Sequence, residues 1–417
     1  MSRTLTKKMA SVKPGSLQVG VDLGLDRNYV VILTERGERV DRFSFSNDRQ
    51  GYDYFLSRIG RAKGEDAGRS VQVGMEPTNY LWKLLATELE QRQQPYCLVN
   101  AFTVKKHREG DQLDRSKDDP RDAFTIADLL RTGKFTQTRL LHGGYAELRG
   151  YAKACERLQV QVSRERNLIW AAARQAFPEL QQVFKDLSGL TVRAMLRHHA
   201  CALEITRLSQ VEFIQAVRQD FTGKRIELRK LRRVHQLAPT SVGVRDGLEA
   251  LQMSLLSDLK VIETLEQQLQ VAKQLLLQQF LALPEAQWML SIPGLGALTA
   301  ALILAELGDP HTFSGSQEWI KLAGTQPTPD SSGRHSATKT PMSHKGRSSL
   351  RLHLFMACLR LVQFNPSFAG WYGYYQHRPQ KPLTKMQALG VLMNKLLKIL
   401  WALIHHQTSF QSLPAAL

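Results

Sequence analysis

The chain has 417 residues, enough for about three domains of ordinary size, and 43% of them are hydrophobic, as buried cores require. Lysine and arginine number 56 against 38 acidic residues, a net charge of +18, so we expect a polyanionic partner: nucleic acid first, an anionic membrane surface second. The basic segment 1–16 has no apolar core, and the apolar run 298–307 is too short to cross a bilayer. We therefore expect a cytoplasmic protein without a membrane partner.

Four cysteines, at positions 97, 155, 201 and 358, are scattered without Cys-x-x-Cys spacing. We expect them to be reduced, mostly buried small apolar residues, with neither a disulfide nor a zinc site.

Residues 1–145 have the pattern of an α/β domain. Three strand-like segments, at 17–22, 29–34 and 40–45, form a meander, and strands and helices then alternate. The later segments are a helix over 48–62, a strand over 70–75, a helix over 80–91 and a short strand over 96–100. A further helix runs from Asp119 to about Arg131, with an apolar stripe at Ala123, Ile126, Ala127 and Leu130.

Residues 146–285 are almost wholly helical. Leucines and isoleucines keep a heptad spacing from Leu248 to Leu276, interrupted by Asp258, and residues 148–173 carry a comparable stripe. The two stripes predict an antiparallel coiled-coil arm or a helical insertion. The basic run at 224–233 between them is usually a solvated helix face, although beside this net charge such a run can also follow phosphates.

Residues 286–417 form a third, mostly helical unit. Ile292-Pro-Gly-Leu-Gly296 between two helical patterns indicates a helix-hairpin-helix motif that can hold a phosphate, and an ordinary tight turn is the alternative. A polar loop over 324–346 precedes helices at 348–363 and 384–405, and polar loops between well-patterned helices often carry function.

Acidic residues stand at three places where a sheet can bring them together. Asp22 ends the first strand, Glu76 ends another, and Asp119 and Asp122 share one face where a helix begins. Taken alone, the last pair is better explained as a helix cap before Pro120 than as a pair of ligands. In an RNase H-like sheet, however, the four acids would converge and repel one another unless they bound a hard cation, Mg²⁺ or Mn²⁺. Two such ions support phosphodiester chemistry.

The order of the motifs resembles that of bacterial insertion-sequence transposases of the Asp-Glu-Asp-Asp class. The motifs are Val19-Gly-Val-Asp22, Met75-Glu-Pro-Thr78, Ser116 to Ala123, Ile292 to Gly296, Gly324 to Gly333 and His344-Lys-Gly-Arg347. The resemblance implies a RuvC-like (RNase H fold) domain over 1–145, an all-α coiled-coil region over 146–285 and a C-terminal transposase domain over 286–417. It covers both ends of the chain, whereas the middle part is similar only in its helical character.

The same resemblance implies which residues act. Asp22, Glu76, Asp119 and Asp122 correspond to the catalytic, metal-binding tetrad, and a serine is the nucleophile that forms a phosphoserine link to DNA. The family pattern ends in Ser-Gly or Ser-x-Gly, so Ser331 and Ser332 are rival candidates. Asp118 stands where the family usually has threonine, and the spacing to Asp122 favours Asp119 as the ligand.

The resemblance also implies partners. Donor and target DNA, a guide (bridge) RNA, a homo-oligomer such as a dimer or tetramer, and association with the nucleoid during the reaction are expected. The residues placed to hold nucleic acid are Lys105, Lys106, Arg334, Lys345, Arg347 and Arg351.

Three other interpretations compete with this one. A RuvC-like, structure-specific nuclease would keep the acids and use water as nucleophile. An actin-like sugar kinase or ATPase also opens with Val-Gly-Val-Asp-Leu-Gly, but it needs a second glycine-rich phosphate loop, which we do not find. A non-enzymatic nucleic-acid scaffold would need none of the acids.

Overall fold

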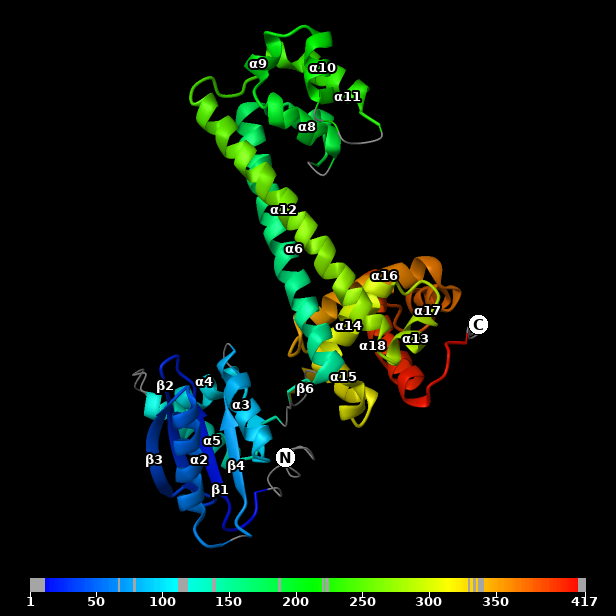
Figure 1. Cartoon of the computed structure of the whole chain (residues 1–417). Helices are drawn as coiled ribbons and strands as arrows, with labels where there is room; N and C mark the ends of the chain where they lie inside the picture. The colour runs from blue at the N-terminus through cyan, green and yellow to red at the C-terminus, as the bar shows by residue number, and fades with distance from the viewer. Residues whose placement is uncertain are drawn as a thin grey trace. The chain divides into compact units, whose positions relative to one another are not determined.

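The computed structural model describes residues 12–411, except 67, 78–79, 112–118, 137–139, 187–188, 220, 222–224, 329–330, 333–334 and 337–340. The chain forms two compact units, Met1–Leu141 and His142–Leu417, which Figure 1 shows in blue to cyan and in green to red. The finer division of the second unit near residue 285 stays a prediction.

The first unit is built on a five-stranded mixed sheet with the order β3-β2-β1-β4-β5. Strands β1, β2 and β3 are antiparallel neighbours, whereas β4 runs parallel to β1 and β5 parallel to β4. This sheet confirms the predicted α/β class of the N-terminal part. The strands are β1 Leu17–Asp22, β2 Arg27–Thr34, β3 Arg39–Ser46, β4 Val71–Met75 and β5 Tyr96–Leu98.

Helices cover both faces of this sheet. Leu17, Val19 and Val21 of β1 share a core with α2 (Arg49–Lys63) and α3 (Leu81–Gln91). Because side chains alternate along a strand, the other residues of β1 face α5 (Asp119–Arg131), which packs on β1, β2 and β4. Helix α4 (Ala101–Asp111), which the sequence analysis did not predict, contacts α5 and so belongs to this second face.

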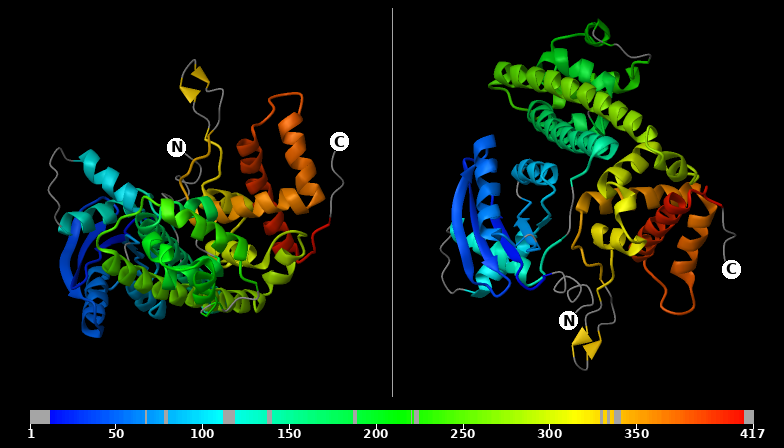
Figure 2. Two further views of the ribbon diagram at one scale, coloured as in Figure 1. Left: turned by 90° about the horizontal axis from the view of Figure 1, so that it is seen from above. Right: turned by 60° about the horizontal axis from the view of Figure 1, so that its bottom comes forward.

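The second unit contains a long pair of helices, α6 (Gly143–Ala176) and α12 (Leu248–Leu281), packed side by side (Figures 1 and 2). Each has 34 residues, a length of about 50 Å at about 1.5 Å per residue. The buried stripe of α12 differs from the predicted heptad, because Leu259, and not the adjacent Asp258, is in the core at 2% exposure. We call this pair of helices the arm; that it forms a coiled coil stays a prediction.

One end of the arm carries a small helical module, residues 177–247, called the tip from here on (Figure 1). Buried aromatic side chains, among them Phe177, Phe184 and Phe213, form its core together with Met195 and Val234. Its helices are α7 Leu180–Val183, α8 Leu190–His198, α9 Ala202–Thr206, α10 Gln210–Gln219 and α11 Leu228–Leu237, followed by the 3-10 helix η1 Ala238–Thr240.

The other end of the arm joins a helical body. Its elements are α13 Glu285–Leu290, α14 Ala297–Leu307, η2 Pro310–Thr312, α15 Ser316–Ala323, α16 Ser348–Phe364, α17 Pro366–His377 and α18 Lys385–His406. Helix α17 was not predicted; it begins at Pro366, where the side chain of Asn365 accepts hydrogen bonds from two backbone N–H groups. Helix α18 is long and apolar enough to cross a membrane, but Leu392, Leu396 and Leu400 are fully buried in the body, as in a core helix.

The turn between α13 and α14 contains the predicted helix-hairpin-helix sequence. Gly294 has φ +92°, a conformation that favours glycine, and the N–H of Leu295 donates to the carbonyl of Ile292 at 3.1 Å. The tight turn is therefore present, while its contact with DNA stays a prediction.

Candidate functional site

Asp22 and Glu76 stand at the carboxyl ends of two neighbouring parallel strands. The register pairs Gly20 with Gly74 and Val21 with Met75, so the next pair in line is Asp22 with Glu76. Parallel neighbours lie about 4.8 Å apart. Gly20 and Gly74 both face α5, and because side chains alternate along a strand, Asp22 and Glu76 come from this same face. Both are half-buried.

Asp122 lies on α5 above that face. The backbone of α5 passes directly over Gly20, next to the carbonyl of Ala123. Ala123 and Ala127 pack against Val31 and Leu33 of β2, and Asp122 itself is only 8% exposed. The fold thus brings three of the four predicted acids to one face of the sheet. Asp119 begins α5, but its side chain lies outside the described part of the structure.

The donor set of these acids suits a hard divalent cation, because carboxylate oxygens are the ligands that Mg²⁺ and Mn²⁺ prefer. Among the described side chains, however, no three acidic, histidine or cysteine groups are close enough to hold one ion. The chemistry and the shared face fit a metal, whereas a complete ligand geometry is not formed by the described residues alone. Metal binding by the tetrad stays a prediction.

A pair of asparagines holds the turn that follows Asp22, and the sequence analysis missed it. Asn28, fully buried, donates to the side chain of Asn47 at 2.7 Å and accepts from the N–H of Gly24 at 3.2 Å. Asn47 in turn donates to the carbonyls of Gly24 and Leu25 at 2.8 and 2.9 Å. A polar amide in the second position of an apolar strand was the signal available in the sequence.

A half-buried hydrogen bond between Asp128 and His107 links α5 to α4. Asp128 of α5 contacts His107 of α4 at 2.9 Å and Arg131 at 2.5 Å. Burial opposes ionisation of Asp128, but the hydrogen bonds from His107 and Arg131 outweigh it and lower the pKa of this carboxyl. The predicted nucleic-acid contacts Lys105 and Lys106 are exposed on α4, and their contact with nucleic acid stays a prediction.

The loop with Ser331 and Ser332 is a narrow hairpin. These serines form β6, which pairs antiparallel with β7 (His335–Ser336), and Figure 2 shows both strands at the far end of a loop that projects from the helical body. The stalk is joined by two backbone bonds of 2.9 Å, from Thr328 to Pro341 and from Ser343 to Gln326. The side chains of Ser331, Ser332 and Arg334 lie outside the described residues, so both serines remain candidates.

The base of this hairpin is fixed to the body. Asn394 of α18 donates to the carbonyl of Thr325 at 3.1 Å and accepts from the Thr325 hydroxyl. Arg351 donates to the carbonyl of Ala323 at 2.8 Å. Arg347 donates to the carbonyl of Glu306. Arg347 and Arg351 thus have structural partners, and their predicted contact with DNA is untested, while Lys345 is exposed.

Glu306, a further buried acid that the sequence analysis missed, joins this base to the arm. It is 4% exposed and contacts Arg149 at 3.3 Å and Lys153 at 3.0 Å, both on α6. Burial and the neighbouring Arg149 lower the pKa of Arg347 to about 10, although Glu306 acts in the opposite direction. The signal in the sequence was a single charge inside the otherwise apolar segment of α14.

Two family models match the ends of the chain. One described as "Transposase" matches residues 19–178, which include β1, β4 and α5. One described as "Transposase IS116/IS110/IS902 family" matches residues 286–373, which include the serine hairpin.

Individual relatives carry related names. The chain is 22% identical over 334 residues to the mini-circle putative transposase for IS117 of Streptomyces coelicolor, covering 76% of this chain and 77% of the relative. It is 25% identical over 303 residues to the IS110 uncharacterized 43.6 kDa protein of the same organism, covering 71% and 73%. A pilin gene-inverting protein of Moraxella bovis is 29% identical over 125 residues, which is 30% of this chain and 38% of that protein.

These matches lie on the two segments that carry the acids and the serine hairpin, and the longer relatives also span the helical arm between them. The chain therefore belongs to the IS110/IS116 family of transposases.

Proposed function

We propose that the protein is a DNA transposase that cleaves and exchanges strands for a mobile insertion sequence, using an acidic metal-binding tetrad and a serine nucleophile. The observation that carries the proposal is the shared face of Asp22, Glu76 and Asp122, two at the ends of adjacent parallel strands and one on the helix above them. The mixed sheet, with three antiparallel strands followed by two parallel ones, supports a RuvC-like fold for this part. The Moraxella relative, named for inverting a gene, supports rearrangement of DNA as the reaction class.

The acids would hold Mg²⁺ or Mn²⁺, which supplies charge neutralisation at the phosphate and activation of the attacking oxygen. A serine hydroxyl, Ser331 or Ser332, attacks the phosphorus of the DNA backbone. The bond from Oγ to phosphorus forms, one backbone P–O bond breaks, and the departing deoxyribose oxygen takes a proton. Attack by a hydroxyl of another DNA end on the phosphoserine reverses the step and joins new strands, so the number of phosphodiester bonds is conserved.

The acids belong to the first unit and the serines to the second. In the proposed reaction, residues of both units act on the same phosphate. Strand exchange also joins several DNA ends, for which we propose a homo-oligomer. A guide RNA is proposed from the family resemblance, and the net charge of +18 is compatible with RNA as well as DNA. Retention of a discrete RNA through purification in high salt would support this part, and full activity after ribonuclease treatment would contradict it.

The serine is tested by trapping the covalent intermediate. Wild-type protein is incubated with DNA containing the element ends and Mg²⁺, denatured, and separated from free DNA. We expect an adduct from the wild type and from Ser163→Ala, which alters an exposed serine on the arm, and none from the Ser331→Ala/Ser332→Ala double variant. The two single variants then identify the nucleophile. Cleavage by the wild type without any adduct would instead indicate a nuclease that uses water.

The acids are tested separately from the serine. Asp22→Asn, Glu76→Gln and Asp122→Asn should each abolish cleavage and weaken Mn²⁺ binding, measured by electron paramagnetic resonance. Asp26→Asn is the matched control, because Asp26 is an exposed acid in the turn just after β1. Unchanged Mn²⁺ binding in all three variants would refute the metal site.

A further inference from the structure

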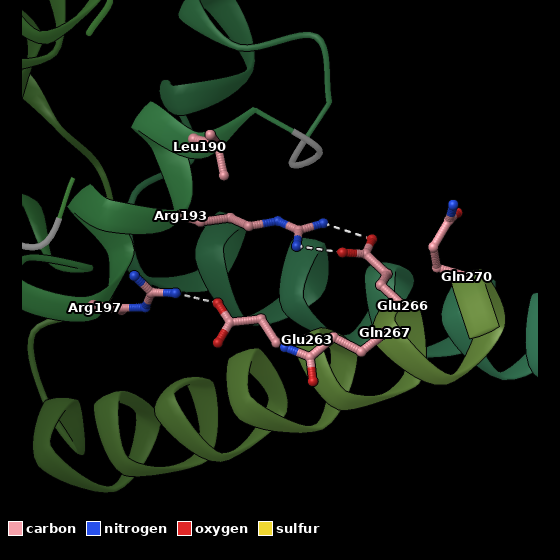
Figure 3. Close-up of a pocket in the computed structure, with 7 residues that line it drawn as sticks. All are labelled: Leu190, Arg193, Arg197, Glu263, Glu266, Gln267 and Gln270. Carbon is pink, nitrogen blue, oxygen red and sulfur yellow. Dashed lines mark hydrogen bonds and ion pairs between the residues drawn. The ribbon is translucent and has the colours of Figure 1, made fainter. Parts of the chain in front are cut away.

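The tip is fastened to the arm by buried and half-buried ion pairs. Arg193 of α8 donates to both carboxylate oxygens of Glu266 on α12, at 2.6 and 2.8 Å, and its side chain is only 8% exposed. Arg197 of α8 pairs with Glu263 one turn away on α12. Figure 3 shows these side chains pointing toward one another across a pocket between α8 and α12. Because the charges in this pocket are paired, we interpret it as a rigid joint and not as a ligand site.

Helix α11 of the tip presents a basic face to solvent. Leu231 and Val234 are fully buried, which turns Arg229, Arg232 and Arg233 outward, and all three are exposed. Residues at these spacings share one side of a helix. None of the three makes an ion pair with a described residue, whereas Lys230 is paired with Glu227 at 2.6 Å. Three neighbouring guanidinium groups that have no acidic partner in the described part of the chain form a surface that suits a polyanion.

The surroundings of this face indicate which polyanion it fits. Sites for single strands usually combine a basic groove with exposed aromatic side chains on which the bases stack. The described residues of the tip expose no such aromatic side chain; their exposed large hydrophobic side chains are all aliphatic. The described residues of the face offer guanidinium groups, whose contacts with phosphates carry no sequence information. A duplex backbone therefore fits better than a single strand. A family that acts on DNA makes duplex DNA the expected partner.

We propose that Arg229, Arg232 and Arg233 form a second DNA contact, at which the tip holds the phosphate backbone of duplex DNA. The arm, about 50 Å long at about 1.5 Å per residue, separates this contact from the helical body that carries the serine hairpin. The rigid joint at Arg193 and Glu266 fixes α11 relative to the arm, so the tip holds flanking DNA at a set distance from the body. This inference rests on the proposed function for its choice of DNA.

The test compares two triple variants of the full chain with the same loss of charge. Arg229→Gln/Arg232→Gln/Arg233→Gln removes the basic face. Arg157→Gln/Arg164→Gln/Lys260→Gln removes three exposed cations from the arm. Binding to a fluorescent 30-base-pair DNA duplex of mixed sequence is followed by fluorescence anisotropy between 50 and 300 mM KCl, and circular dichroism checks that both variants are folded.

We expect the α11 variant to raise Kd by about ten- to a hundredfold and to lower the salt slope by about 2 to 3, because each phosphate contact contributes about 0.9 to that slope. The arm variant should change Kd by less than about threefold. Equal losses in the two variants would mean that only net charge matters, and would overturn the proposal. If the triple variant does not fold, Arg232→Gln alone should lower the slope by about one.

Two further measurements test for other partners of the basic face of α11. A loss of affinity for duplex RNA with unchanged affinity for duplex DNA would overturn the proposal in favour of RNA. Loss of self-association on gel filtration, with DNA binding intact, would identify a protein interface instead. The binding measurement does not depend on the serine reaction. If the wild type binds duplex DNA through α11 but forms no adduct, the proposed reaction is refuted and the proposed DNA contact is not.

Discussion

A Cβ atom added to Gly20 would stand 2.1 Å from the carbonyl oxygen of Ala123. The same atom would lie 2.5 Å from the backbone nitrogen of Ala127. Strand β1 and helix α5 therefore touch backbone to backbone, and this contact sets how close Asp122 comes to the sheet edge that carries Asp22.

Gly20→Ala should separate α5 from the sheet. No Cβ fits at these distances, and because the neighbouring atoms are backbone, the whole helix must move. We expect a loss of about 3 kcal/mol or more in the free energy of unfolding, together with loss of cleavage. Urea titration followed by circular dichroism measures the first. Gly60→Ala is the control, since nothing lies within 4 Å of its Cβ position on α2 and it should stabilise by about 0.5 to 1 kcal/mol.

Glu306→Gln should destabilise the second unit strongly. The change leaves Arg149 and Lys153 facing Arg347 without their shared carboxylate, and removing one partner of a buried pair costs about 3 to 5 kcal/mol. Thermal unfolding of the variant measures the effect. Glu156→Gln is the matched control. Glu156 also pairs with Lys153, at 2.6 Å, but its side chain is 44% exposed, so losing this ion pair should cost less than about 1 kcal/mol of unfolding free energy. An equal loss of stability in the two variants would contradict the expectation that the ion pairs of Glu306 matter more because Glu306 is buried.

Except for α4, the order of elements in the first unit could be predicted from the sequence, because each strand is bounded by turn residues and helices α2, α3 and α5 keep a clear apolar stripe. The predicted helix over 48–62 is observed at Arg49–Lys63, one residue later, since Asp48 caps it by accepting from the N–H of Gly51. Strand β1 has the predicted bounds. These features could be predicted because they depend on residues that are close together in the sequence.

Relationships across the sheet could not be derived from local sequence patterns, because they depend on register and packing; the convergence of the acids was expected only from the resemblance to an RNase H-like sheet. The sequence placed Asp22 and Glu76 at strand ends, but only the pairing of Gly20 with Gly74 makes the two acids neighbours. Helix α4 was missed because its sequence has only a weak apolar stripe. Glu306 was missed because its partners Arg149 and Lys153 are more than 150 positions away along the chain.

Acid should weaken the tip through His199. Burial, and then the neighbouring His198, lower the pKa of His199 below its ordinary value of 6.5, and its Nε2 has no hydrogen-bond partner among the described residues. The unfolded chain therefore binds a proton more readily than the folded one. The stability that results is present above pH 6.5 and is lost as the pH falls through the folded pKa.

Thermal unfolding at pH 7.5 and pH 5.5 measures this effect. His199→Phe keeps the contact with Phe213, at 5.8 Å between ring centres in the wild type, and removes the titrating group. We expect a smaller drop in Tm on acidification in this variant than in the wild type. His377→Gln, at an exposed histidine of α17, should leave the wild-type drop unchanged. The same drop in all three proteins would exclude His199 as its source.

The four cysteines should react slowly with thiol reagents in the folded protein. All four are free and buried, as the sequence analysis expected. Burial raises the pKa of Cys358 to about 12, and burial with the nearby Glu204 raises that of Cys201 to about 11, so little reactive thiolate exists at pH 8. A chromogenic disulfide reagent should detect four thiols in 8 M urea and almost none in buffer. Ser163→Cys, exposed on α6, should add one fast-reacting thiol; rapid labelling of the native wild type would contradict the burial.

Asn394 and Thr325 should act as a pair in holding the serine hairpin. Thr325 is 1% exposed, so Asn394→Leu leaves its carbonyl buried without the amide donor and its hydroxyl with only the longer bond to the carbonyl of Ile320, at 3.4 Å, at a cost of about 1 to 3 kcal/mol. Thr325→Val removes the hydroxyl that donates to the side-chain oxygen of Asn394, while the Asn394 amide still donates to the backbone carbonyl of residue 325. The double variant replaces both polar side chains by apolar groups, and should be less destabilised than the sum of the single variants by about 1 kcal/mol, because the bond between the Thr325 hydroxyl and Asn394 is counted in both single variants.

A double-mutant cycle on urea unfolding measures that coupling, and additive effects would refute it. The yield of trapped adduct then separates stability from positioning. We expect the double variant to be more stable than the single variants predict, but to give little adduct. In that variant the two hydrogen bonds that join residue 325 to α18 in the wild type are absent, so the base of the hairpin is no longer held in place. Recovery of both would mean that the pair stabilises the body without positioning the serines.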